Sequence, residues 1–226
     1  NASFVPPNDV AALESELASG GVAALFIEVI QGEAGIYPLS DEFVQAAREL
    51  TERHGALLVI DEVQTGAGRT GEWLAHTRYG ITPDVVTLAK GMGGGFPVGA
   101  VIGYGAAASL LSPGQHGNTF GGNPPAAAAA LAVAREVEGL LGRVAEVGER
   151  WREDLRAVPG VVDVRGRGLL IGVELDRPSA PIQAALLSAG IITNSVNPTT
   201  LRLAPSYLIS DDDADRFTRA LTSVLA

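Results

Sequence analysis

Residues 56–63 read Ala-Leu-Leu-Val-Ile-Asp-Glu-Val, a short apolar run that closes on two carboxylates. A nearly unbroken apolar run of this length predicts a strand covered on both faces, as in parallel sheets. Val22–Ile30 is a second run of this kind. Between the two, Ser40 can cap a helix over residues 41–54, and Gly55 can end that helix in a left-handed conformation. Strand, helix and strand at this spacing predict a right-handed parallel crossover unit and an α/β fold.

Two more apolar runs, Asp84–Ala89 and Val98–Tyr104, predict further strands of the same sheet. The pattern changes at Asn123-Pro124, where a capping residue is followed by proline at the first helical position. We therefore place a domain boundary near residue 122. Residues 1–122 form the predicted α/β portion, and residues 123–226 form a smaller α+β domain.

The second predicted domain starts with a long helical stretch towards Ala157, broken near Gly139 or Gly142. A last helix opens with Ser210-Asp211-Asp212-Asp213, a capping-box pattern. The elements predicted between these helices are a hairpin of Val161–Val164 and Leu169–Leu175, a helix up to Gly190, and short strands at Ile191–Asn194 and Leu201–Leu203.

Composition excludes several classes of protein. Of the 226 residues, 46% are hydrophobic, which is enough for a sizeable core. The net charge of −10 disfavours nucleic acid or an anionic membrane as a partner. The absence of cysteine excludes disulfides and a thiolate metal site, and we expect no metal. The start, residues 1–7, lacks the basic and apolar regions of a signal peptide and reads like a chain already under way.

Polar side chains stand where two of the predicted strands end. Asp61 closes the run LLVI, and Lys90 closes VVTLA. Ligands of open α/β sheets bind beyond the carboxyl ends of the strands, so the two side chains are expected to face one crevice. Taken alone, each residue fits an ordinary surface charge at the end of a strand better.

Lys90 is followed by the glycine-rich segment 91–97, Gly-Met-Gly-Gly-Gly-Phe-Pro. Such a segment turns sharply and approaches its neighbours closely, which suits a confined lysine whose pKa is lowered for attack on a carbonyl. A flexible turn between two strands is the plain alternative. The segment is not a phosphate-binding P-loop, because the lysine precedes the glycines.

Two further segments are candidates for binding anions. Residues 116–123, His-Gly-Asn-Thr-Phe-Gly-Gly-Asn, lead into a helix start, whose free N–H groups favour phosphate. Arg202 is a charge within the apolar run 201–205, where a guanidinium can bind a carboxylate through two bonds. A plain capped helix and an exposed edge-strand arginine explain the same patterns equally well.

Four motifs occur in order with matching separations, and together they resemble one family. They are GALLVIDEVQTGAGRTGE (55–72), PDVVTLAKGMGGGFPVGA (83–100), HGNTFGGNP (116–124) and LRLAP (201–205). The combination resembles the class III aminotransferases of pyridoxal-phosphate fold type I, above all the acetylornithine aminotransferases and next the ornithine aminotransferases. The resemblance covers essentially the whole chain. It implies a large domain with a mixed, mostly parallel sheet and helices on both faces, plus a small C-terminal α+β domain.

The resemblance implies a set of residues for the cofactor, pyridoxal 5'-phosphate. Lys90 is the lysine that carries it as a Schiff base and later moves the substrate proton. Asp61 pairs with the ring nitrogen, Val63 lies against one ring face, and Gln64 reaches the phenolic oxygen. Thr119 binds the phosphate of the cofactor in the opposite subunit, which implies a homodimer with shared active sites.

The resemblance also implies residues for the substrates. Arg202 binds the α-carboxylate of glutamate or 2-oxoglutarate, and Glu33 neutralises this arginine when the ω-amino substrate is bound. Asn118 holds a substrate-side position where the family usually has serine. Val29 replaces the usual proline of the EPIQGE motif.

The implied function is transamination between N-acetylornithine and 2-oxoglutarate in arginine biosynthesis. Ornithine and 4-aminobutyrate aminotransferases are the alternatives within the class. The family's N-terminal portion, which supplies further cofactor and substrate contacts, is absent from this sequence. A cofactor-poor fragment or a structural subunit without turnover is therefore the alternative outside catalysis. A nicotinamide-binding domain is disfavoured, because no GxGxxG motif follows the first strand.

Overall fold

The computed structural model describes residues 2–226, and contacts between elements divide the chain into two compact units. The division differs from the predicted boundary at residue 122, since residues 123–137 group with the first unit through side chains such as Val133, which lies against Gly94. Unit 1 consists of residues up to 29, 39–67 and 74–137, and unit 2 consists of residues 30–38, 68–73 and 138–226.

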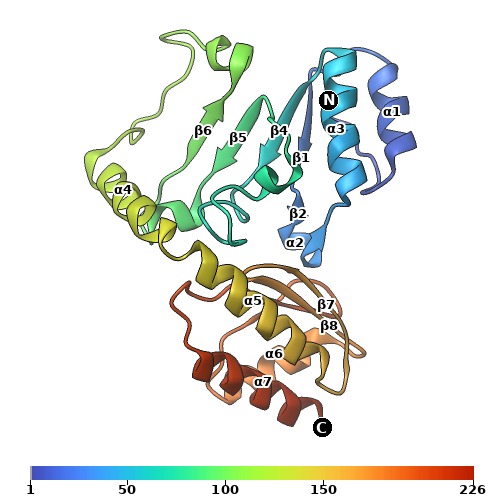
Figure 1. The fold of residues 1–226 in the computed structure, drawn as a ribbon, viewed down its shortest axis with the longest axis vertical. Helices are drawn as coiled ribbons and strands as arrows, with labels where there is room; N and C mark the ends of the chain where they lie inside the picture. The colour runs from blue at the N-terminus through green and yellow to red at the C-terminus, as the bar shows by residue number, and fades with distance from the viewer. Residues whose placement is uncertain (1) are drawn as a thin grey trace. The chain divides into compact units, whose positions relative to one another are not determined.

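The sheet of unit 1 has four strands in the order β1-β4-β5-β6 (Figure 1). Its members are β1 (Ala24–Ile27), β4 (Leu57–Asp61), β5 (Val85–Leu88) and β6 (Ala100–Gly103). β1 pairs with β4 and β4 with β5 in parallel, while β6 runs antiparallel to β5. The prediction of a mixed, mostly parallel sheet is therefore confirmed.

Helix α3 (Asp41–His54) has the bounds and caps that the sequence predicts. The Ser40 hydroxyl accepts a hydrogen bond from the Phe43 amide at 3.1 Å, and Gly55 ends the helix with φ 71°. Acidic residues in the first turn and basic residues in the last turn both match the helix dipole. α3 packs beside α1 (Val10–Ala18), which the sequence analysis did not predict. Their shared core with the sheet comprises Leu13, Leu17, Val29, Leu39, Phe43, Val44, Ala47, Leu50, Ala56, Leu58, Ile60, Ala75 and Tyr79.

The prediction of one strand over Val22–Ile30, covered on both faces, is wrong. The run divides into β1 of unit 1 and β2 (Ile30–Gln31), which belongs to unit 2. Phe26, in the middle of β1, is 67% exposed, because β1 is the edge strand of its sheet and its outer face is uncovered in the described chain.

The rest of unit 1 consists of short 3-10 turns and one long helix. The predicted helix from residue 124 towards 157 is broken at Gly139-Leu140, and only its first part belongs to unit 1. The elements are η1 (Ala75–Tyr79), η2 (Lys90–Gly93), η3 (Gly105–Ser109) and α4 (Pro124–Glu138).

Unit 2 contains an antiparallel sheet in the order β7-β8-β10-β9, with three helices on one face. The predicted hairpin is β7 (Val161–Arg167) and β8 (Leu170–Leu175). The other strands are β9 (Asn194–Ser195) and β10 (Thr200–Leu203), and the helices are α5 (Leu141–Arg156), α6 (Ser179–Ser188) and α7 (Asp211–Leu225). The core between them includes Val144, Trp151, Leu155, Ile171, Val173, Leu175, Leu186, Leu201, Leu203, Phe217 and Leu221.

The opposite face of this sheet is covered by residues 30–38, which form β2, α2 (Gly32–Gly35) and β3 (Tyr37–Pro38). Ile30 and Ile36 pack on Leu170 of β8. Arg165 of β7 donates to the Gly35 carbonyl at 2.8 Å. Residues 30–38, from the first part of the chain, therefore cover one face of a sheet whose strands all lie after residue 160.

No helix within residues 2–226 has both the length and the apolar character needed to cross a bilayer.

Candidate active site

The carboxyl ends of two neighbouring strands of unit 1 bring Asp61 and Lys90 to one edge of the sheet. Asp61 is the last residue of β4, and its register partner on β5 is Thr87. Lys90 follows two residues after the end of β5 and starts η2. Since β4 and β5 are parallel, both strand ends lie at the edge where open α/β sheets bind ligands.

Asp61 is held by the turn that follows it. The carboxylate is half-buried, and its Oδ1 accepts a hydrogen bond from the Val63 amide at 2.9 Å. Val63 and Gln64 are half-buried in the same turn. A carboxylate has about four acceptor positions, so Asp61 retains capacity for a ligand N–H.

Lys90 has a backbone conformation that side chains rarely adopt. Its φ is 44°, and it is one of four non-glycine residues with positive φ among residues 2–226. Such a conformation costs on the order of 1 kcal/mol or more for a residue other than glycine and persists where the surrounding structure enforces it. The glycine turn continues with Gly94 and Gly95, also at positive φ. The lysine side chain is exposed and therefore accessible to a ligand.

Lys90 is also the only lysine of the 226-residue chain. The other fifteen residues of its Lys and Arg total are arginines. Arginine remains protonated in proteins and does not serve as a nucleophilic amine. Any covalent chemistry of a side-chain amine in this chain is therefore confined to one atom, Lys90 Nζ.

The hydroxyl of Thr87 has no hydrogen-bond partner although it is buried. Thr87 stands next to Asp61 across the β4–β5 pair, at the edge that carries Lys90. An unpaired buried hydroxyl costs about 1–3 kcal/mol, so this atom is a polar group that the chain's own residues leave unsatisfied.

Glu62, directly after Asp61, anchors the turn from inside. Its side chain is fully buried, and each carboxylate oxygen accepts two hydrogen bonds. Oε1 accepts from the His76 amide and lies 2.8 Å from His76 Nδ1, while Oε2 accepts from the Ala75 amide and the Thr65 hydroxyl. Burial raises the pKa of Glu62, but these hydrogen bonds, led by that of His76, outweigh it and hold the pKa below its usual value of 4.5.

The predicted phosphate-binding segment 116–123 is an exposed turn that leads into α4. Asn118 Oδ1 accepts from the Phe120 amide at 3.1 Å, and Asn123 Oδ1 caps α4 by accepting from the Ala126 amide at 3.0 Å. Thr119 is exposed within this turn. The N-terminus of α4 is thus already capped by the chain itself.

The structure brings Arg202 and Glu33 together in unit 2. Leu201 and Leu203 of β10 face the helices, so Arg202 between them points to the face covered by α2. Its Nη1 donates to Glu33 Oε1 at 2.7 Å and to the Gly32 carbonyl at 3.4 Å. Arg202 is 16% exposed and Glu33 is 69% exposed, so the carboxylate has room to leave.

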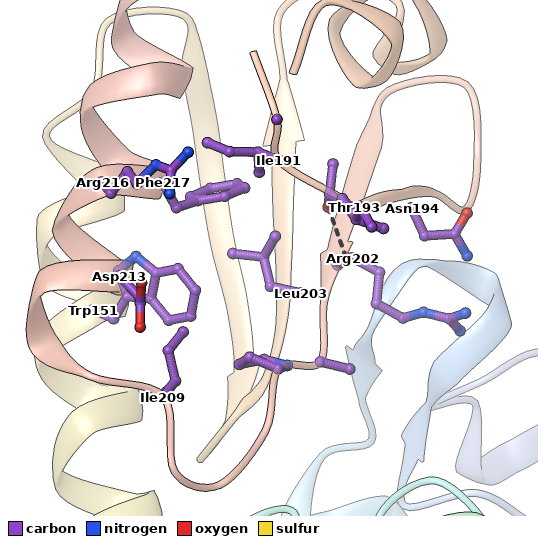
Figure 2. A pocket seen from close by; sticks show the side chains of 14 residues that line it. Trp151, Ile191, Thr193, Asn194, Arg202, Leu203, Ile209, Asp213, Arg216 and Phe217 are labelled. Carbon is purple, nitrogen blue, oxygen red and sulfur yellow. Dashed lines mark hydrogen bonds between the residues drawn. The ribbon is translucent and has the colours of Figure 1, made fainter. Parts of the chain in front are cut away.

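Unit 2 also contains a pocket of about 460 Å³ beside β9 and β10. Its apolar wall includes Ile191, Leu203 and Phe217, and Arg216 and Asp213 of α7 lie at its border. Figure 2 shows the Arg202 side chain extending away from these apolar side chains. The guanidinium of Arg202 therefore lies on the face of the sheet that carries Glu33, and not among the apolar side chains of this pocket (Figure 2).

Residues 6–225 match the family described as Aminotransferase class-III. The chain belongs to the class-III aminotransferase family. The acetylornithine aminotransferase of Corynebacterium efficiens is 50% identical over 206 residues, which are 90% of this chain and 51% of that protein. The chain thus spans about half the length of the curated relatives it matches.

Solved structures agree with the family. The N-acetylornithine aminotransferase of Stenotrophomonas maltophilia has a TM-score of 0.88 at 35% identity, covering 99% of this chain and 61% of that one. An ornithine aminotransferase of Toxoplasma gondii, described with partial occupancy of pyridoxal phosphate at its active site, has a TM-score of 0.89 at 34% identity, covering 99% of this chain and 57% of that one. The chain therefore has the fold of type I, and class-III aminotransferases depend on pyridoxal 5'-phosphate.

Sequence reasoning missed two features of this site. Thr87 is a polar residue inside the apolar run VVTLA, and that interruption is the signal that the sequence offers. Glu62 is the second carboxylate of the pair that closes β4, and its partner His76 lies 14 residues further on. Neither the unpaired Thr87 hydroxyl nor the Glu62–His76 contact follows from spacing alone, because packing decides which of these polar groups finds a partner.

Proposed function

We propose that this chain is the part of an aminotransferase that holds pyridoxal 5'-phosphate through Lys90 and exchanges amino groups between N-acetylornithine and 2-oxoglutarate. The observation that carries the proposal is the position of the only lysine. It stands at the carboxyl end of β5, in a strained backbone conformation, beside the strand that ends in Asp61.

The residues at this edge fit the cofactor. The Thr87 hydroxyl has no hydrogen-bond partner, and the Asp61 carboxylate has acceptor positions beyond the one that the Val63 amide uses. Both groups can therefore bind a polar ligand. Asp61 suits the protonated ring nitrogen, Gln64 the phenolic oxygen, Val63 a ring face and Lys90 the aldehyde carbon. Thr119, on its exposed turn, is assigned to the phosphate of the cofactor in a second subunit.

When bound, pyridoxal phosphate supplies an electron sink for charge that develops at the substrate Cα. The chain's own groups do the rest. Asp61 holds a proton on the ring nitrogen through its negative charge, and Lys90 Nζ, once free, moves the proton at the substrate Cα. One oxygen of Asp61 accepts from the Val63 amide, and Glu62, the next residue, is anchored by four hydrogen bonds.

The ion pair of Arg202 with Glu33 supports a proposal for how one enzyme accepts two kinds of substrate. Arg202 binds the α-carboxylate of glutamate or 2-oxoglutarate through its planar guanidinium. When the substrate presents an amine end, the ion pair with Glu33 neutralises the arginine. The exposure of Glu33 supports this role, since an exposed partner exchanges at little cost.

The choice of N-acetylornithine rests on the named relatives, among which acetylornithine aminotransferases have 50% identity. Ornithine aminotransferase is the second candidate, because several of the similar solved structures carry that name. Transamination of 4-aminobutyrate and a catalytically incomplete fragment are the remaining alternatives. We further propose a homodimer with shared active sites, with Asn118 on the substrate side, and a cytoplasmic enzyme of arginine biosynthesis.

The test is a visible absorption spectrum of the purified chain with pyridoxal phosphate, before and after glutamate is added. We expect a yellow band that changes with glutamate, and borohydride reduction should fix the cofactor on the peptide that contains Lys90. Lys90→Arg is the matched control, because it keeps the positive charge and removes the amine. A band of equal strength in this variant, or no band in the unaltered chain, would overturn the assignment.

A further inference from the structure

Thr87, at the edge of the sheet that carries Asp61 and Lys90, has a buried hydroxyl without a hydrogen-bond partner. Across residues 2–226, its Oγ1 and Arg48 Nε are the buried side-chain polar atoms recorded without a hydrogen bond. Arg48 has other partners through its Nη1, which donates to Asp84 at 2.9 Å. Thr87 has no second side-chain polar atom to compensate, so its hydroxyl requires a physical explanation.

The backbone places this hydroxyl beside Asp61. Thr87 and Asp61 are Cα partners on parallel strands, and neighbouring strands lie about 4.8 Å apart with partner side chains on the same face. The Thr87 hydroxyl and the Asp61 carboxylate therefore belong to neighbouring side chains on one face of the sheet. That carboxylate accepts from the Val63 amide at Oδ1 and has further acceptor positions.

The surroundings of the pair are fixed, which leaves the two side chains as the adjustable part. The Thr87 carbonyl accepts from the Glu62 amide at 2.9 Å, so the ends of β4 and β5 are joined. Glu62 is in turn buried and held by four donors. With the backbone joined at this point, Thr87 is the register partner of Asp61 on the neighbouring strand, and its hydroxyl is a donor at that position.

We propose that Thr87 is a positioning residue for Asp61, whose hydroxyl donates to the Asp61 carboxylate when that carboxylate turns to the ring nitrogen of pyridoxal phosphate. The inference rests on the proposed function. Without the cofactor the hydroxyl is left unpaired, and with it the hydroxyl gains a charged acceptor. Cofactor binding thus relieves an unfavourable group that the cofactor-free chain contains.

The first test measures the affinity for pyridoxal phosphate by absorbance titration. Thr87→Val keeps the shape and removes the hydroxyl, so we expect its dissociation constant to rise about tenfold, the size of one charge-assisted hydrogen bond. Thr87→Ser keeps the hydroxyl and should stay within about twofold of the unaltered chain. In an Asp61→Ala background, Thr87→Val should change nothing further, because the acceptor is gone.

The second test follows thermal unfolding of the cofactor-free chain. Removing an unpaired buried hydroxyl in favour of a methyl group is neutral or stabilising, so Thr87→Val should unfold at the same or a higher temperature. The variant thus combines lower cofactor affinity with undiminished stability. A purely structural role for Thr87 predicts a lower unfolding temperature.

Two results would overturn the inference while leaving the proposed function intact. One is unchanged cofactor affinity in Thr87→Val when the unaltered chain binds through Lys90. The other is a lower unfolding temperature of the cofactor-free Thr87→Val variant. A chain that forms no Lys90-dependent band at all refutes the proposed function instead, and with it the role of Thr87.

Discussion

Replacing Glu62 by Gln tests the anchor behind the cofactor edge. The carboxylate accepts four hydrogen bonds, two at each oxygen. Glutamine keeps one oxygen and puts an NH2 group where the other oxygen was. If the NH2 faces His76, the ring nitrogen can accept from it but the His76 amide loses its acceptor. If it faces the other side, the Thr65 hydroxyl can accept but the Ala75 amide loses its acceptor.

Either orientation therefore leaves one buried backbone N–H unpaired, which costs about 1–3 kcal/mol. Loss of the charge weakens the remaining bonds, since hydrogen bonds to charged groups contribute about 1.5–3 kcal/mol against about 1 kcal/mol for neutral ones. We expect Glu62→Gln to lower the free energy of unfolding by about 3 kcal/mol at pH 7. Glu52→Gln, on the exposed side of α3, is the matched control and should stay within about 0.5 kcal/mol.

The difference in free energy of unfolding between Glu62→Gln and the unaltered chain also depends on pH. The pKa of Glu62 is lowered in the folded state, so its contribution is fully present above the unfolded value of 4.5 and is lost as the pH falls through the folded pKa. Urea unfolding followed by circular dichroism at 222 nm, at pH 7 and at decreasing pH below 4.5, measures both effects. Glu62→Gln within 0.5 kcal/mol of the unaltered chain at pH 7, or a gap that widens as the pH falls, would refute the reasoning.

Three further changes have directions that the structure sets. Gly148→Ala in α5 would place a methyl group on a backbone carbonyl of the β7–β8 turn and should destabilise unit 2 by about 3 kcal/mol. Gly142→Ala in the same helix is the control, since its methyl group meets open space and should stabilise unit 2 by up to about 1 kcal/mol. Tryptophan fluorescence in urea measures both changes. Ser40→Ala removes the cap of α3 and should cost about 1 kcal/mol by circular dichroism; no loss would contradict the capping bond. Arg202→Ala should impair the half-reaction with glutamate more than that with N-acetylornithine in stopped-flow absorbance, and equal losses would refute its carboxylate role.

Local signals in the sequence predicted the elements whose ends they fix. Ser40 and Gly55 bound α3 as predicted, because a cap and a left-handed terminator act within a few residues. Ser210 likewise caps α7 through the Asp213 amide. The run Val22–Ile30 misled because its second part pairs with β3 and packs on a sheet formed more than 130 residues later. Hydrophobic periodicity carries no information about such a partner.

In the candidate site, too, local sequence signals predict some features and long-range packing decides the others. The positions of Asp61 and Lys90 at strand ends follow from apolar runs that stop at a charge, so the sequence predicts them. The pairing of Arg202 with Glu33 spans 169 residues and was expected only from the family resemblance. The isolation of Thr87 Oγ1 and the four bonds of Glu62 depend on packing between strand, turn and helix, which a pattern in one dimension does not specify.

The interleaving of the two units has a consequence for how the chain folds. The chain passes between the units five times, and the Arg202–Glu33 pair closes a loop of 169 residues. Closing such a long loop costs conformational entropy before the contacts that stabilise it can form. Unit 2 contains contacts between residues far apart in the sequence, so we expect it to fold slowly. A nascent chain leaving the ribosome would carry residues 30–38 with their apolar side chains Ile30 and Ile36 unpaired until β8 emerges. Cutting the chain at residue 138 would not yield two autonomous domains, because the second piece would lack residues 30–38 and 68–73 of unit 2, while the first piece would carry those two segments without the rest of their unit.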